Sequence, residues 1–200
     1  MRDIEGFILT GGASSRMGVD KALLELGRRT FVERIYSALE IISTRICLVG
    51  RSEKFAALPS LPTVPDIHVK WGALGGLHAA IKACKAEWAA VVACDLPFVT
   101  GELFVRLASL RENFDAIVPV QADGHLQPLC ALYRSKVCRE RAEDLIAEGE
   151  RRPRALLERV RTRLVAFDEL SDLHQATLFF MNINTPQEFA DAKRKENSDE

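Results

Sequence analysis

The chain has 200 residues, 48% of them hydrophobic, so it is long enough to form one domain with a buried core that needs neither disulfides nor a structural metal. Its formal net charge of -1 excludes a general electrostatic attraction to nucleic acid or anionic lipid, so affinity for phosphate has to come from local groups of charge. Five cysteines form no Cys-x-x-Cys pair and acidic residues precede a short first apolar run; we therefore expect core thiols and a cytoplasmic protein without signal peptide or membrane span.

The first predicted element is a buried strand that ends in a cationic, glycine-rich loop. The apolar residues 7–9 are followed by Gly11 and Gly12, whose backbone N–H groups can form an anion-binding nest, and then by the charges of Arg16 and Lys21. The run matches neither a Walker A loop nor the fingerprint Gly-x-Gly-x-x-Gly. It favours a phosphate-binding loop of another kind, and the alternative is a surface turn with solvated charges.

A helix and a second strand follow the loop. Thr30 and Glu33 have the spacing of a capping box and predict a helix that continues to Ile42. The apolar residues 46–49, with β-branched side chains at both ends, then predict a strand that ends at Gly50. A parallel pairing with a right-handed crossover would leave the glycine-rich loop at the carboxyl end of the first strand, where open α/β sheets bind ligands.

Residues 52–70 contain three prolines and predict a long loop, which carries Asp66. A second glycine cluster, residues 72–76, precedes a helix expected from Leu77. We expect Gly75 and Gly76 to present the N-terminus of this helix to the same ligand. The alternative is that these glycines only allow close packing.

Residues 88–94 predict a buried strand that stops at Asp95. Mg2+ takes oxygen ligands, often one or two protein carboxylates with water and substrate phosphates, so Asp95 is a candidate magnesium ligand. The alternative is a carboxylate that caps a loop. Thr100 already provides a cap for the helix that follows, which favours the metal.

The second half of the chain predicts further strands and helices. Residues 116–120 form a strand, and the turn at Asp123-Gly124 leads back into the apolar residues 129–132, so part of the sheet is expected to be antiparallel. Ser135 is expected to cap a helix that ends at Gly149, and Pro153 to begin another.

The last predicted strands are residues 163–167 and 178–181. Asn182 and Asn184 follow the second of these, where they either orient an acceptor or metal-bound waters or serve only the turn. Thr185 and Glu188 form a capping box for the last helix. We expect a domain over residues 1–193 and a polar tail over 194–200 that frays.

Several short motifs in order resemble the molybdenum cofactor guanylyltransferases of the nucleotidyltransferase superfamily. They are Leu9-Thr-Gly-Gly, Ser15-Arg-Met-Gly, Asp20-Lys, Gly72 to Leu77, Cys94-Asp-Leu-Pro, Gln127-Pro-Leu and Asn182-Ile-Asn-Thr-Pro. Gly12 resembles the guanylyl branch, since the cytidylyl branch more often has Ala there. Arg51 and Ala73 depart from the family's usual Asn and Pro.

The resemblance implies a single three-layer α/β/α domain with a mostly parallel, Rossmann-like sheet. It implies that Leu9, Thr10, Gly11 and Gly12 hold the base and phosphates of GTP, Lys21 the phosphates, Asp66 the nucleotide, and Asp95 the Mg2+. The reaction implied is attack by the terminal phosphate of molybdopterin on the α-phosphorus of GTP, with release of pyrophosphate, which Arg16 and Lys21 would steady.

The same resemblance implies GTP and molybdopterin as small-molecule partners, together with proteins that supply the cofactor or receive the product, and no nucleic acid or membrane. Two alternatives use the same sequence features. One is a cytidylyl- or sugar-phosphate nucleotidyltransferase, and the other is a non-catalytic carrier or adaptor for the pterin cofactor.

Overall fold

The computed structural model describes residues 3–10, 21–50, 61–67 and 71–196. Within them a central seven-stranded sheet has the order β5-β4-β1-β6-β8-β7-β9. The strands are β1 (Ile4–Leu9), β4 (Ile46–Val49), β5 (Thr63–Val64), β6 (Trp88–Ala93), β7 (Ala116–Pro119), β8 (Cys130–Arg134) and β9 (Thr162–Val165). All neighbours pair in parallel except β8, which is antiparallel to both β6 and β7.

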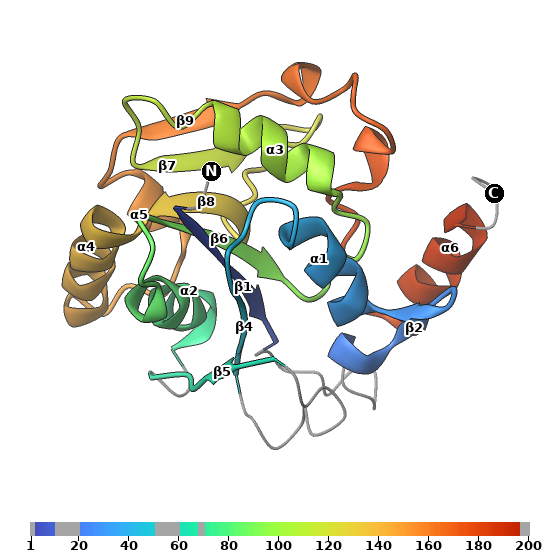
Figure 1. Ribbon diagram of the computed structural model, residues 1–200, viewed down its shortest axis with the longest axis horizontal. Coiled ribbons are helices and arrows are strands. Elements are labelled where there is room, and N and C mark those ends of the chain that lie inside the picture. Colours follow the sequence, from blue (N-terminus) through green and yellow to red (C-terminus); the bar gives the residue numbers. More distant parts are fainter. Residues whose placement is uncertain (1–2, 11–20, 51–60, 68–70, 197–200) are drawn as a thin grey trace.

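Helices cover both faces of this sheet and make three layers (Figure 1). Helices α1 (Phe31–Leu39) and α3 (Gly101–Ser109) pack on one face; α2 (Gly72–Ala83), α4 (Ser135–Ala147) and α5 (Arg154–Leu157) pack on the other. The alternation of side chains along a strand divides the core in two. In β1, for example, Ile4 and Ile8 face the first pair of helices, whereas Phe7 and Leu9 face α2.

A smaller apolar cluster lies beside the main layers. The hairpin of β2 (Glu25–Leu26) and β3 (Arg29–Thr30) packs against the last helix, α6 (Pro186–Glu196), at the side of the molecule (Figure 1). Leu26, Phe31, Phe98, Leu178, Ile183 and Ala192 are its buried members. This cluster holds helix α6 against the β2–β3 hairpin, two elements from opposite ends of the sequence.

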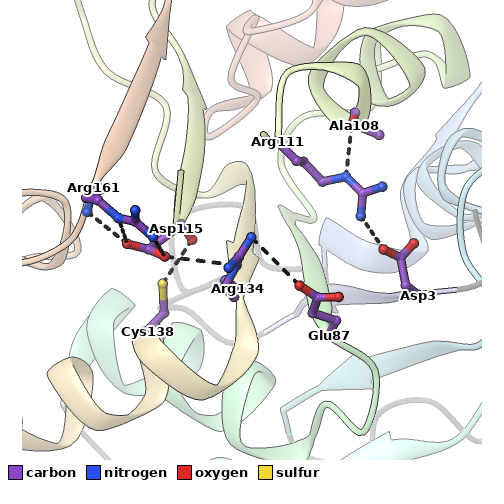
Figure 2. A network of polar contacts seen from close by, with 8 residues as sticks. All are labelled: Asp3, Glu87, Ala108, Arg111, Asp115, Arg134, Cys138 and Arg161. Carbon is purple, nitrogen blue, oxygen red and sulfur yellow. Dashed lines mark hydrogen bonds and ion pairs between the residues drawn. The ribbon is translucent and has the colours of Figure 1, made fainter. Parts of the chain in front are cut away.

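The edge of the sheet where the parallel strands begin holds a network of paired charges (Figure 2). The buried carboxylate of Asp115 accepts hydrogen bonds from Arg161 Nε at 2.9 Å and Nη2 at 3.0 Å, and these bonds lower its pKa. Arg134 lies 3.9 Å from Asp115, and Arg111 is 2.8 Å from Asp3. The two guanidinium groups of Arg134 and Arg111 also lie 5.2 and 5.4 Å from the ring of Trp88. We call these residues, with Glu87, the starting-edge network.

Most local predictions are confirmed. The capping box of Thr30 and Glu33 starts α1, and Thr100 caps α3 by accepting a hydrogen bond from the Leu103 amide. The predicted β-strands over residues 46–49, 88–94 and 116–120 agree with β4, β6 and β7 to within a residue or two. The expected three-layer, mostly parallel α/β architecture is therefore the one observed.

Three predictions of local structure are wrong. Residues 178–181 do not form a strand: a 3-10 helix (Ala176–Leu178) and a turn occupy this stretch, and its apolar side chains are buried against α6 and α3. Helix α2 begins at Gly72, not at Leu77. Helix α4 begins at Ser135 itself, after Arg134, and no side-chain hydrogen bond caps it. Burial of apolar side chains, which a turn can achieve as well as a strand, explains the first error.

The structure also adds elements that the sequence did not predict. The proline-containing segment includes the two-residue strand β5, and residues 21–30 form a 3-10 turn (Lys21–Leu23) and the β2–β3 hairpin. Helix α6 continues past Lys193 to Glu196, whose carboxylate pairs with Arg34 at 2.5 Å. Across the described ranges, no helix combines the length and apolarity needed to cross a bilayer.

Candidate active site

The carboxyl ends of β1 and β6 lie side by side and define the site. The Cys94 amide, just after β6, donates a hydrogen bond to the carbonyl of Leu9 at 3.0 Å. Thr10 follows β1, and both its amide and its hydroxyl donate to the Val49 carbonyl at the end of β4, at 2.9 and 2.8 Å. The chain therefore leaves β1 between two parallel neighbours, at the edge where such sheets bind ligands.

Lys21 and Asn184 meet at this edge although 163 residues separate them in the chain. The Lys21 ammonium donates a hydrogen bond to Asn184 Oδ1 at 2.6 Å. Asn184 is held in turn by its own amide, which donates to Glu188 Oε2 at 2.6 Å. The next residue back, Ile183, donates its amide to the Asp95 carbonyl at 3.0 Å. The start of α6 is thus tied both to the lysine and to the end of β6.

Asp95 has the electrostatic character of a carboxylate kept for a ligand. Burial raises its pKa, and the nearby Lys21 ammonium lowers it in part. None of the other described residues donates a hydrogen bond to its side-chain oxygens. Glu188 differs, because the hydrogen bond from the Asn184 amide is the main cause that lowers its pKa. Among the described residues, the backbone N–H of Asp95 itself is the one donor that lowers the pKa of the Asp95 carboxylate further. A partly buried carboxylate whose charge is only partly compensated is stabilised when a cation or a donor from a ligand arrives.

A cleft of about 520 Å³ opens beside Asp95 on the side of β8 and β7. Its lining consists of Ala73, Ala93, Asp95, Leu96, Gln121, His125, Leu126, Gln127, Pro128, Leu129, Pro153 and Asn182. It combines apolar walls with a few amide groups and one carboxylate, as small-molecule sites usually do. Ala73, where the resembling family usually has Pro, is one of these wall residues.

The structure brings together only some of the residues predicted for the site. Lys21, Asp95 and Asn184 are grouped, and Asn182 lies with Asp95 in the cleft. Asp66 follows β5 at the same edge of the sheet, but β4 and β1 stand between β5 and β6.

The remaining predicted residues divide into two groups. Leu9 is buried in the core against α2, and Gly75 is buried within α2 instead of presenting the helix N-terminus, which lies at Gly72. A Cβ added at Gly76 would lie 3.8 Å from Leu9 Cδ1, an ordinary contact. Gly11, Gly12 and Arg16 fall outside the described residues, and so does Arg51.

Sequence reasoning missed two contributors to this edge. Glu188 was recognised as half of a capping box, but its proximity to Lys21 and Asp95 depends on how α6 packs. His125 stands on the hairpin between β7 and β8, with Nδ1 3.0 Å from Asp123 Oδ1. The turn signal at Asp123-Gly124 identified the hairpin, and only the antiparallel placement of β8 shows that it borders the cleft.

The donor set at Asp95 suits a cation that shares its coordination with a substrate. In the described part of the chain, no three His, Cys, Asp or Glu side chains gather as a metal cage. The carboxylate of Asp95, free of donors from its described neighbours, is the kind of oxygen ligand that Mg2+ takes when phosphates and water complete its shell. The residues present therefore fit Mg2+ delivered with a nucleotide.

A mostly parallel α/β sheet, with a lysine ammonium and a half-buried carboxylate at its carboxyl edge, is typical of α/β proteins that bind ligands at this edge. Residues 6–164 match the sequence model of the family described as "MobA-like NTP transferase domain". The chain belongs to this family of nucleotidyltransferases.

Relatives and solved structures agree with this assignment. The chain is 35% identical over 193 residues to a Pelotomaculum thermopropionicum protein named "Probable molybdenum cofactor guanylyltransferase", which covers 96% of this chain and 93% of the relative. A Clostridium perfringens protein of the same name is 33% identical, covering 94% and 95%. The crystal structure of molybdopterin-guanine dinucleotide biosynthesis protein A from Archaeoglobus fulgidus superposes with a TM-score of 0.80 at 26% identity, covering 97% and 99%.

Proposed function

We propose that this protein transfers GMP from GTP to the terminal phosphate of molybdopterin, giving the guanine dinucleotide form of the cofactor and pyrophosphate. Support comes from relatives of nearly equal length that carry this activity in their names. The match extends over 96% of the chain, so it includes the segments of Lys21, Asp95 and Asn184 together.

The observation that carries the proposal is the position of Asp95 between two halves of the carboxyl edge. On one side lie the ends of β1, β4 and β5, with Asp66 after β5. On the other side lies the cleft beside β8 and β7. We assign the first half to GTP and the cleft to molybdopterin, so that the α-phosphate and the attacking phosphate meet at Asp95.

The reaction needs no covalent intermediate on the protein. An oxygen of the terminal phosphate of molybdopterin forms a bond to the α-phosphorus, and the bond from the α-phosphorus to the oxygen that bridges to the β-phosphate breaks. Transfers of this kind are accelerated by alignment and by stabilisation of charge on phosphate oxygens. Lys21 would bind the departing pyrophosphate, and Asn184, which accepts a hydrogen bond from its ammonium at 2.6 Å, would orient the lysine.

Asp95 would hold Mg2+, and Asn182, which lines the same cleft, would help to orient metal-bound water. When bound, the ion supplies neutralisation of negative charge on the phosphates. Arg16 would add a second cation on the pyrophosphate, as the resemblance implies. Gly11 and Gly12 would offer backbone N–H groups to the same phosphates.

We also place the reaction in the cytoplasm, with partner proteins that supply molybdopterin or receive the product. None of the five cysteines forms a disulfide, and four of them are buried, as is usual for a protein in a reducing compartment. The formal charge of -1 supports a small-molecule substrate over a nucleic acid or an anionic membrane.

The test is release of pyrophosphate from GTP, CTP, ATP or UTP with molybdopterin and Mg2+, with binding of each nucleotide measured by calorimetry. We expect turnover with GTP that exceeds that with the other three. Faster turnover with CTP would support the cytidylyl alternative. Tight binding of nucleotide or pterin without any pyrophosphate would support a carrier, and either result would overturn the proposal.

A further inference from the structure

The side chain of Arg34, in α1, contacts three segments, one of them 8 residues away in the sequence and the others 63 and 162 residues away. Its Nε donates to the Pro97 carbonyl at 3.1 Å, and its Nη1 donates to the Leu26 carbonyl at 3.2 Å. The same Nη1 pairs with Glu196 Oε1 at 2.5 Å. The guanidinium also lies 5.6 Å from the centre of the Phe98 ring.

Each of these three segments carries a residue of the candidate active site. Leu26 closes the short segment that begins at Lys21. Pro97 and Phe98 follow Asp95 directly after β6. Glu196 is the last residue of α6, the helix that Asn184 and Glu188 connect to the site at its other end. One side chain therefore joins the three pieces of backbone that have to keep Lys21, Asp95 and Asn184 in register.

The chemistry of the contact is directional. The apolar cluster of Leu26, Phe98 and Ile183 attracts the same segments to one another, but apolar burial does not fix their orientation. A planar guanidinium presents N–H groups in fixed directions, and a charged donor makes a stronger hydrogen bond than a neutral one. Arg34 and Glu196 are also both mostly shielded, each with 21% of its side chain exposed, so solvent screens the pair only in part.

We infer that Arg34 is a positioning residue for the nucleotidyl transfer, one that holds the segments of Lys21, Asp95 and α6 in a single arrangement. It touches no substrate and acts through the residues that do. This inference rests on the proposed function for its kinetic consequence. Its structural consequence, that loss of Arg34 loosens the three segments together, does not depend on the identity of the substrate.

Arg106 offers a matched control, because it makes the same kind of contact away from the site. From α3 its Nη1 donates to the Glu169 carbonyl at 2.5 Å, and its Nη2 pairs with Asp172 Oδ2 at 2.8 Å. This arginine therefore also joins a helix to a carbonyl and a carboxylate. Neither of its partners belongs to a segment that carries a site residue.

The first experiment is hydrogen exchange, followed by mass spectrometry, on the full-length wild type and on Arg34→Met, Arg34→Lys, Glu196→Gln and Arg106→Met. We expect Arg34→Met to accelerate exchange at least threefold in peptides covering residues 21–26 and 94–99 and at the Ile183 amide, which donates to Asp95. Arg34→Lys, which retains charge, should show a smaller effect. Arg106→Met should leave these peptides at the wild-type rate.

The second experiment measures kcat and KM for GTP, with molybdopterin and Mg2+, in the same variants. We expect kcat to fall about tenfold in Arg34→Met and less in Arg34→Lys, with KM for GTP changed less than twofold, because misplacement affects the transition state more than ground-state binding. Arg106→Met should keep the wild-type kcat even if its melting temperature falls as much as that of Arg34→Met.

The outcomes separate this inference from the proposed function. A wild type that releases no pyrophosphate contradicts the proposed function, while the exchange data still test the joined segments. Wild-type exchange in Arg34→Met, or faster exchange with unchanged kcat in an active enzyme, would overturn the positioning role. If Arg34→Met does not fold, the milder variants Arg34→Lys and Glu196→Gln test the inference, since both retain hydrogen-bonding groups. A wild-type exchange rate and a wild-type kcat in both of these variants would overturn it.

Discussion

The two edges of the central sheet use charge in opposite ways. At the starting edge, the Asp115 carboxylate is buried and receives a fork of hydrogen bonds from Arg161, with Arg134 nearby (Figure 2). At the carboxyl edge, Asp95 is also shielded, but no other described residue donates to its side-chain oxygens. The first environment lowers the pKa of its carboxyl group and the second raises it. Paired charge at one edge therefore serves the fold, whereas the less compensated charge at the other edge is the one that we propose for a ligand.

We expect the largest effect on activity from a substitution of Asp95, at the centre of the carboxyl edge. Asp95→Asn keeps the size of the side chain and removes its charge, so turnover should fall on the order of a hundredfold to a thousandfold. Stability should stay equal or increase, because the burial that raises the pKa of Asp95 disfavours its charged form, and the amide of asparagine carries no charge. Pyrophosphate release and urea denaturation measure the two quantities. Near-normal activity that still depends on Mg2+ would exclude Asp95 as the metal ligand.

Lys21 should come next in magnitude and separates catalysis from binding. If its ammonium stabilises charge that grows on pyrophosphate, Lys21→Ala should lose roughly a hundredfold in kcat and less in GTP affinity. Lys21→Arg should recover only part, since a planar fork replaces a point charge beside Asn184. Single-turnover kinetics provide the measurement. A raised KM with unchanged kcat would make Lys21 a residue of uniform binding and move the catalytic role to Arg16 and the metal.

At the starting edge the same kind of substitution should act on stability instead. Asp115→Asn removes the charge that Arg161 and Arg134 face, and we expect a loss of about 2 kcal/mol in the free energy of unfolding, less than for a fully buried pair because Arg161 is mostly exposed. The kcat of the folded fraction should not change. An Asp115→Asn variant with wild-type stability but reduced kcat would contradict the conclusion that charge at the starting edge serves stability and charge at the carboxyl edge serves activity.

The pH dependence of that loss sharpens the comparison. The pKa of Asp115 in the folded protein lies below its ordinary value, so its contribution to stability is present above about pH 3.9 and disappears as the pH falls through the folded pKa. The difference in unfolding free energy between wild type and Asp115→Asn should therefore be full at pH 7 and shrink below pH 4. Urea titrations at several pH values test this. A difference that stays constant down to pH 2 would assign it to packing instead of charge.

The smallest expected effect concerns Trp88, which two cations flank. Arg111→Met removes one contact with the ring and the pair with Asp3, while the apolar stem is retained. We expect a loss of about 0.5–1 kcal/mol in the free energy of unfolding. Thermal unfolding with Arg45→Met as an exposed control gives the measurement. A loss of unfolding free energy larger than that of Asp115→Asn would show that the contacts with the Trp88 ring, not the carboxylate pairs, contribute most to stability at the starting edge.

Local patterns were sufficient where neighbours in the sequence determine the structure. The two capping boxes, at Thr30 and Thr185, need only residues three positions apart, and both were predicted. The strand that ends at Asp95 was visible because a fully apolar run stops at a carboxylate. These features depend on backbone hydrogen bonds and burial that a short window of sequence already specifies.

The parts that could not be predicted depend on tertiary packing. The hydrogen bond between Lys21 and Asn184 joins residues 163 positions apart, and α6 has to dock on the β2–β3 hairpin before it can form. Strand β5 has only two residues and forms because β4 offers an edge for parallel pairing. Residues 178–181 were mistaken for a strand because their apolar side chains serve a three-way junction of α6, α3 and the sheet.

The reversed direction of β8 has a consequence for how this protein family can vary. A parallel strand would enter the sheet from the starting edge, but β8 enters from the carboxyl edge. The hairpin of residues 120–129 therefore borders the cleft at the point where the run of parallel strands is interrupted. Surface hairpins tolerate insertions and substitutions better than sheet interiors do. With the acceptor in the cleft, as we propose, that half of the site can be remodelled by evolution, or by a designer, through one exchangeable loop without a change in the strands of the other half.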